Sequence, residues 1–78
     1  MATRDLVIDT LAKELRRPPE DIASADSLSQ LGVESLEMVS VVMALEDKLK
    51  IQLSDRELQK VQSIDDLVAL VERTQGQS

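Results

Sequence analysis

Residues 35–49 read SLEMVSVVMALEDKL, and this stretch decides the fold. Met38, Val41, Val42, Leu45 and Leu49 recur at the i, i+3, i+4, i+7 spacing that places apolar side chains on one face of a helix. The stretch therefore predicts the main helix of the protein, with this face turned toward a core.

Three further segments show helical signals. Residues 3–16 carry apolar residues at helical spacing and have Thr3 as a possible cap, while Ser54 and Ser63 open a short helix at 54–60 and a last helix at 63–74. Residues 75–78 are expected to be a tail. No strand pattern or repeat is present. The sequence predicts an all-α fold in one domain over residues 1–78, a small bundle of three main helices plus a short fourth.

A long connection at 17–34 separates the first two helices. Pro18 and Pro19 end the first helix, and the segment that follows is rich in Asp, Ser and Pro. Because its length exceeds that of ordinary loops, it is expected to have a function or some packing of its own. Ile22, Leu28 and Leu31 are expected to anchor it to the core.

The composition excludes several classes of function. The chain has no Cys and no His, so it offers neither a thiolate nucleophile nor an imidazole base, and nothing places a Lys near a serine. No catalytic or metal site is expected. A net charge of −6 argues against nucleic acid and favours partners with Lys and Arg patches. No apolar run reaches membrane-spanning length, and a cytoplasmic protein is the default.

Two acid-serine-leucine triplets compete for the role of a functional serine. Ser27 lies within the long connection and reads as an ordinary turn former. Ser35 stands at the start of the strongest helix, where it could simply be an N-cap. The same position suits a phosphate ester, since free amides and the positive end of the helix dipole favour an anion there.

The helix at 35–49 also carries apolar residues on the face opposite its core. Leu36 and Met43 point away from the Met38 side, with Glu37 and Asp47 beside them and Glu46 at the flank. Single exposed apolar residues are common and need no explanation. A pair rimmed by acids beside Ser35 is equally consistent with a docking patch.

The stretch SLSQLGVESLEMVSVVMALEDKL resembles the acyl carrier protein family, whose hallmark is Leu-Gly-x-Asp-Ser-Leu at the start of its second helix. Here the hallmark reads LGVESL over residues 31–36, and the resemblance covers essentially the whole chain. It implies a carrier rather than an enzyme. In that family the hallmark serine, Ser35 here, receives 4′-phosphopantetheine from coenzyme A through a Mg²⁺-dependent phosphopantetheinyl transferase, and acyl groups ride on the thiol of this arm as thioesters.

The resemblance also implies roles for other residues and a set of partners. The expected partners are acyl transferases, ketosynthases and related enzymes with basic docking patches, and the carrier is expected to be a monomer. An acyl chain between the helices would be lined by Met38, Val41 and Leu45. The docking positions carried over from the family are Glu34, Leu36, Glu37, Met43, Glu46 and Asp47.

Several residues depart from the family pattern. Glu34 replaces the usual Asp before the serine, Ser40 stands where an acid is frequent, and Lys48 and Lys50 interrupt the acids that usually follow. These departures favour a discrete carrier of a specialised polyketide or other secondary pathway over a fatty-acid carrier. The alternative function is a non-covalent helical adaptor that has the fold without the arm. A small serine hydrolase would lack a base.

Overall fold

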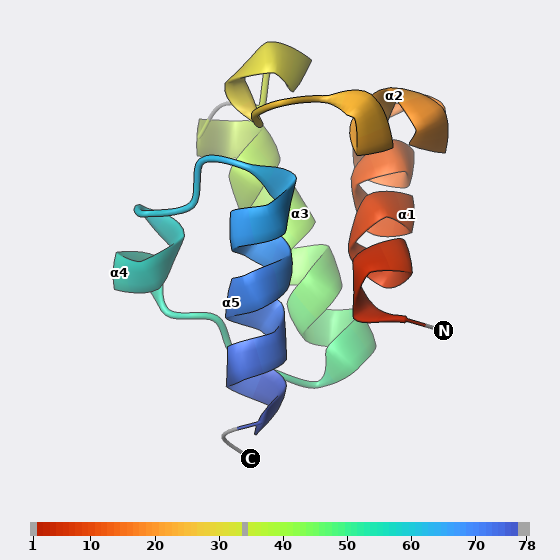
Figure 1. The fold of residues 1–78 in the computed structure, drawn as a ribbon. Coiled ribbons are helices and arrows are strands. Elements are labelled where there is room, and N and C mark those ends of the chain that lie inside the picture. The colour runs from red at the N-terminus through yellow and green to blue at the C-terminus, as the bar shows by residue number, and fades with distance from the viewer. Residues whose placement is uncertain (1, 34, 77–78) are drawn as a thin grey trace.

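The computed structural model describes residues 2–33 and 35–76, and helices are the only regular secondary structure in these ranges. The predicted all-α bundle is therefore confirmed, with three long helices and shorter ones between them (Figure 1). In chain order the elements are α1 (Thr3–Leu15), α2 (Pro19–Ser24), the 3-10 helix η1 (Ser29–Leu31), α3 (Ser35–Leu49), α4 (Asp55–Leu58) and α5 (Ile64–Gly76).

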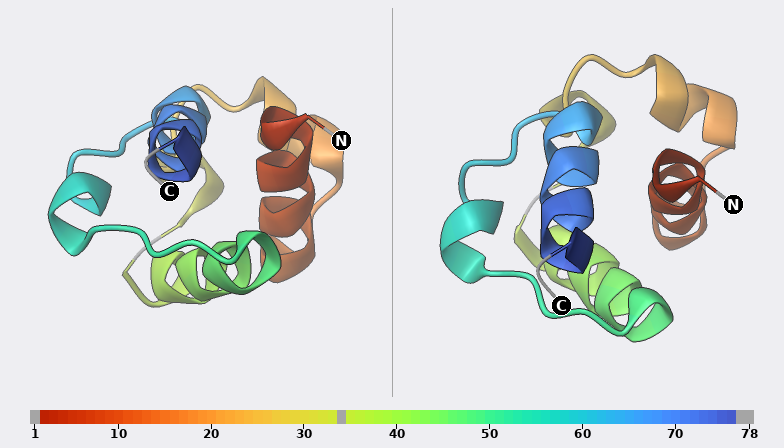
Figure 2. Two further views of the ribbon diagram at one scale, coloured as in Figure 1. Left: turned by 90° about the horizontal axis from the view of Figure 1, so that it is seen from below. Right: turned by 60° about the horizontal axis from the view of Figure 1, so that its bottom comes forward.

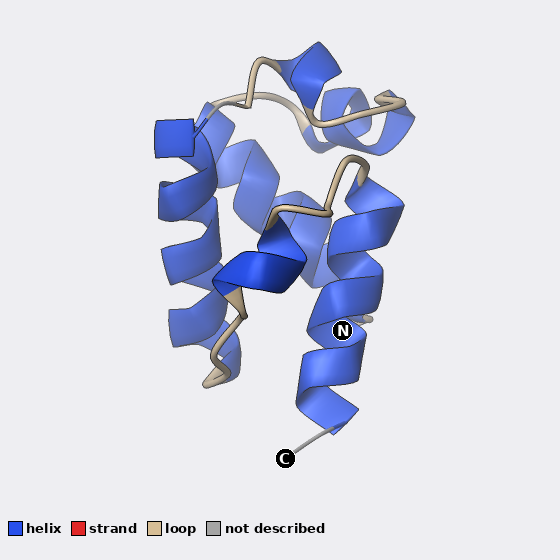
Figure 3. Cartoon of the chain, turned by 90° about the vertical axis from the view of Figure 1, so that its left-hand side faces the viewer, coloured by secondary structure: helices blue, strands red, loops and turns tan. Residues whose placement is uncertain are grey.

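Helix α1 packs against most of the other helices. It lies against α2, α3 and α5, and its residues Val7 and Leu11 are fully buried. The short helix α4 packs against α5 and lies on the side of the bundle away from α1 (Figure 2). Seen from that side, α4 crosses in front of the space between α3 and α5 (Figure 3).

The core is built from aliphatic side chains, as expected from a chain without Phe, Tyr or Trp. On α3 the expected face is confirmed, because Val41, Val42 and Leu45 are buried while Met38 and Leu49 pack against the core from its edge. Helix α5 contributes an apolar stripe to this core and, in addition, Leu70. The stripe comprises Ile64, Leu67, Val68 and Val71.

The connection between α1 and α3 is partly helical, which corrects the expectation of one long loop over 17–34. Pro19 occupies the first turn of α2, where its missing N–H costs nothing and its fixed φ suits a helix. The three expected anchors, Ile22, Leu28 and Leu31, are all buried. The segment thus has packing of its own.

Ser27 is part of the turn that opens η1. Its hydroxyl accepts a hydrogen bond from the backbone N–H of Gln30 at 3.2 Å, and the Gln30 side chain accepts one from the N–H of Asp26 at 2.8 Å. This reciprocal arrangement satisfies two backbone donors in the manner of a capping box. The first of the two triplets therefore has a structural explanation.

A backbone hydrogen bond ties this connection to the segment between α4 and α5. The N–H of Leu28 donates to the carbonyl of Gln62 at 2.9 Å, and the N–H of Val33 donates back to the carbonyl of Leu28 at 3.2 Å. The chain that leads into α3 is thereby held at a fixed point of the bundle.

The helix caps agree with the sequence at two positions and differ at one. Ser54 accepts the N–H of Glu57 at 3.5 Å, while Ser63 and Asp66 accept each other's N–H at 3.0 and 3.3 Å. Thr3 is not a cap, because it already lies within α1 and its hydroxyl bonds to the side-chain oxygen of Gln75 at 3.3 Å. The last helix extends to Gly76, into the expected tail.

The complete burial of Leu45 allows a stability prediction. Leu45→Ala should lower the free energy of unfolding by about 2–5 kcal/mol, because it removes buried apolar surface and leaves a cavity. Urea unfolding followed by circular dichroism measures this change. The control is Asp47→Ala on the exposed side of the same helix, which should change stability by no more than about 0.5 kcal/mol. Equal losses in the two variants would contradict the packing described for α3.

Candidate functional site

The start of α3 follows a tight turn at Gly32 that has free space around it. Gly32 ends η1 with φ +74°, a left-handed conformation that glycine adopts without strain, and its N–H donates to the carbonyl of Ser29 at 2.9 Å. Ser35 is the first residue of α3. Glu34 and the side chain of Ser35 lie outside the described part of the structure. The turn places the backbone of Ser35 at the end of a helix, where amide donors are unpaired.

An apolar stripe lies on the exposed side of α3. Leu36, Val39 and Met43 are 82%, 54% and 63% exposed, which makes them the large apolar residues most open to solvent among those described. The sequence indicated Leu36 and Met43 but missed Val39. The signal was present, because 36, 39 and 43 follow the i, i+3, i+7 spacing of one helix face. Such a stripe exceeds the isolated exposed residues that need no explanation.

The acids expected beside this stripe have two different environments. Glu37 and Asp47 are exposed on α3. Glu46 is half-buried, and its Oε2 accepts a hydrogen bond from the backbone N–H of Leu53 at 2.8 Å. Glu46 therefore takes part in the fold as well as lying near the proposed docking face.

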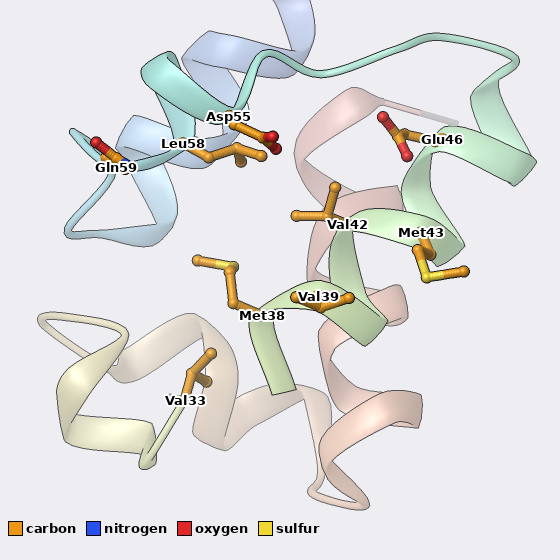
Figure 4. Close-up of a pocket in the computed structure, with 9 residues that line it drawn as sticks. All are labelled: Val33, Met38, Val39, Val42, Met43, Glu46, Asp55, Leu58 and Gln59. Carbon is orange, nitrogen blue, oxygen red and sulfur yellow. The ribbon is translucent and has the colours of Figure 1, made fainter. Parts of the chain in front are cut away.

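A groove of about 890 Å³ lies between α3 and α4, and we call it the α3–α4 groove. Figure 4 shows Leu58 and Asp55 of α4 facing Met38 and Val42 of α3, with Val33 on the far side. The wall of the α3–α4 groove is mostly apolar, with polar groups on the α4 side and at Glu46. The lining residues are Val33, Met38, Val39, Val42, Met43, Glu46, Asp55, Leu58 and Gln59.

The three residues expected to line an acyl-chain cleft lie in two different environments. Met38 lines the α3–α4 groove, whereas Val41 and Leu45 do not, because both are fully buried in the core. Val42 is next to Val41 in sequence but lies one helical step further round, which brings it to the groove wall. Of the expected set, Met38 thus lines this groove, while a place for Val41 and Leu45 in an acyl-chain cleft stays a prediction.

The described residues around Ser35 leave space for a large group attached at this point. The neighbouring Leu36 is largely exposed, and a Cβ placed on Gly32 would meet no atom within 4 Å. The groove lining begins two residues before Ser35, at Val33, and resumes three residues after it, at Met38. An arm attached at this helix start would have open solvent on one side and an apolar groove on the other.

The described residues form neither a metal site nor a membrane-spanning helix. Within residues 2–33 and 35–76, no group of three or more acidic, His or Cys side chains could hold a metal ion. In the same part of the chain, no helix has the length and apolar character needed to cross a membrane.

Comparison with known proteins identifies the class. Residues 5–71 match the family described as a phosphopantetheine attachment site. Among similar proteins, the acyl carrier protein of Akkermansia muciniphila is 37% identical over 73 residues, covering 94% of this chain and 88% of that protein. The acyl carrier protein of Campylobacter curvus is 36% identical over 74 residues (94% of this chain and 96% of that protein), and that of Wolinella succinogenes is 33% identical over 73 residues (92% and 96%).

The chain therefore belongs to the acyl carrier protein family. Proteins of this family are carriers and not catalysts, in agreement with a chain that lacks His and Cys. The family match implies a covalently bound 4′-phosphopantetheine group. It also implies work with a phosphopantetheinyl transferase and with biosynthetic enzymes in general.

The positive φ at Gly32 leads to a prediction about the turn before α3. Gly32→Ala should destabilise the protein by about 1–2 kcal/mol, because an L-residue is strained in the left-handed region although there is space for its methyl group. Thermal unfolding measures the effect. Gly76→Ala is the matched control, since Gly76 also has open space but no positive φ, and it should be neutral or slightly stabilising. Equal destabilisation by both substitutions would show that backbone strain at Gly32 is not the cause.

Proposed function

We propose that Ser35 is the residue joined to 4′-phosphopantetheine and that the chain presents acyl groups, carried on this arm, to the enzymes of a biosynthetic pathway. The observation that carries the proposal is the position of Ser35, which begins α3 between two lining residues of the α3–α4 groove, Val33 and Met38. The family hallmark at 31–36 points to the same serine.

The backbone around Ser35 suits the chemistry of attachment. The Ser35 Oγ would form the ester bond to the phosphorus of 4′-phosphopantetheine as the diphosphate P–O bond of coenzyme A breaks and adenosine 3′,5′-bisphosphate leaves. The Ser35 proton would pass to a base supplied in the complex with the transferase, since the chain itself offers no His for this role. The first-turn amides of α3 and the positive end of its dipole would then favour the negatively charged phosphodiester. When bound, the arm supplies a terminal thiol that carries acyl groups as thioesters.

The α3–α4 groove gives a place where an aliphatic acyl chain could be sheltered from water. Met38, Val39, Val42 and Leu58 provide an apolar surface close to the start of α3. Methionine side chains adapt their shape easily, so a wall containing Met38 and Met43 suits chains of different length. Met38 is the member of the expected cleft set that lines this groove, and the part played by Val41 and Leu45 stays a prediction.

The exposed side of α3 is proposed to dock partner enzymes. The apolar stripe of Leu36, Val39 and Met43 would enter contact with the partner, while Glu37 and Asp47 would face its Lys and Arg side chains. Charge complementarity of this kind speeds encounter and orients the partners. Acyl transferases and ketosynthases with basic patches are the partners proposed here.

Among pathways, a specialised polyketide or other secondary pathway is proposed before fatty-acid synthesis. The reason is the sequence of α3, where Ser40, Lys48 and Lys50 make the helix and its end less uniformly acidic than in housekeeping carriers. A cytoplasmic location and a monomeric state remain predictions from the sequence. The competing function is a helical adaptor that binds partners without an arm.

Attachment is tested by intact mass. Incubation of the full-length apo-protein with coenzyme A, Mg²⁺ and a broad-specificity phosphopantetheinyl transferase should add the mass of one 4′-phosphopantetheine group. Ser35→Ala should abolish the gain, whereas the control Ser27→Ala should retain it, because the Ser27 hydroxyl belongs to the η1 turn. A gain that survives Ser35→Ala would contradict the assignment. No gain in the unmodified sequence, together with a partner complex that tolerates Ser35→Ala, would support the adaptor.

Docking is tested by charge reversal. Glu37→Lys or Asp47→Lys should weaken binding to the transferase and make the remaining binding less sensitive to salt, because both remove attraction to a basic patch. Titrations at low and at physiological ionic strength measure the difference. Glu72→Lys, an exposed reversal on α5, is the control and should change binding much less. Equal effects of all three reversals would indicate attraction by overall charge and not docking through α3.

A further inference from the structure

The hydrogen bond between Glu46 and Leu53 joins the end of α3 to the segment that leads into α4. The Glu46 Oε2 lies 2.8 Å from the backbone nitrogen of Leu53, seven residues along the chain. The Leu53 side chain is buried, so it fixes the place where the segment crosses the bundle. The carboxylate adds an acceptor for an N–H that the helices do not satisfy, and hydrogen bonds to charged groups are stronger than neutral ones.

Apart from this hydrogen bond, helix α4 is held by the packing of its half-buried Leu58 against the core and by its contact with α5. It consists of four residues, Asp55–Leu58, none of which is buried. Its ion pair from Glu57 to Arg73 of α5, at 3.3 Å, is largely exposed and therefore contributes little. A four-residue helix is not stable on its own, so its position depends on its tertiary packing and on the contacts of its flanking segments. The Glu46 contact stands directly before α4, at the residue preceding its N-cap Ser54.

The position of α4 determines the shape of the α3–α4 groove. Asp55, Leu58 and Gln59 form the side of the groove that faces α3, and Glu46 itself lies at its edge (Figure 4). A rotation of the segment at Leu53 would move this side relative to Met38 and Val42. The Glu46 carboxylate thus connects α3, which forms one wall of the groove, to the segment that leads into α4, which forms the other wall.

We infer that Glu46 is a positioning residue that fixes α4 through the Leu53 N–H and so sets the shape of the α3–α4 groove. This role differs from the docking role that the sequence suggested for Glu46. Its use in acyl transport rests on the proposed function, in which the groove shelters the acyl chain. The hydrogen bond itself does not depend on that proposal.

The experiment compares wild-type protein with Glu46→Gln, Glu46→Ala and, as matched control, Asp47→Ala. The glutamine variant keeps a side-chain oxygen that can accept the Leu53 N–H but removes the charge, the alanine variant removes both, and Asp47 is an exposed acid next in sequence. Amide hydrogen exchange in the full-length protein is the first measurement. Exchange at Leu53 should become roughly tenfold faster in Glu46→Ala, stay near wild type in Asp47→Ala, and be largely restored in Glu46→Gln.

The second measurement reports on the groove. With the arm loaded with an octanoyl group, the methyl signal of Met38 should shift relative to the unloaded protein in wild type and Glu46→Gln, and the shift should fall by at least half in Glu46→Ala. The inference would be overturned if, in Glu46→Ala, the Leu53 amide exchanged at the wild-type rate and the Met38 shift were unchanged. Equal behaviour of Glu46→Gln and Glu46→Ala would overturn it as well. Absence of a Met38 shift in wild type would instead contradict the groove's proposed use, while Leu53 exchange would still decide whether Glu46 positions the segment.

Discussion

The packing of α3 against α1 is the contact on which the rest of the arrangement depends. Val7 and Leu11 of α1 are fully buried, as are Val41 and Leu45 of α3, and together they belong to one aliphatic core. Because successive residues of a helix turn by about 100°, burial of the Val41 and Leu45 side of α3 in this core directs the opposite side toward solvent. The exposed stripe and the groove wall both follow from this division. Burial of apolar surface supplies the driving force.

The groove arises from an incomplete enclosure of the bundle. Helix α4 packs on α5 and leaves the adjoining surface of α3 partly uncovered, so apolar residues such as Met38 and Val42 line an open space. A domain of this size buries little apolar surface, so its stability is modest. Leaving apolar surface uncovered lowers that stability further unless the surface binds something. In a carrier of the acyl carrier protein family, cargo that shields this surface would offset the cost.

The sequence predicted those features that depend on periodic spacing. The bounds of α3 follow from five apolar residues on one face, and the anchors Ile22, Leu28 and Leu31 stood out because the surrounding segment is polar. Helix α2 was missed because six residues are too few for a periodic signal, although Pro19 followed by two acids is a typical helix start. Val41 and Leu45 were assigned to a cleft because a pattern gives the direction of a face but not the neighbour that covers it. The Glu46 bond to Leu53 depends on how the chain returns after α3, which spacing does not encode.

The backbone bond between Leu28 and Gln62 has a mechanical consequence. Residues 50–62 bond to the C-terminal part of α3, through Glu46, and to the chain that precedes its N-terminus, through Leu28. This segment therefore connects the two ends of the helix. One continuous segment of the chain therefore borders the space proposed for the cargo and also bonds to the chain that leads into the helix start proposed for the arm.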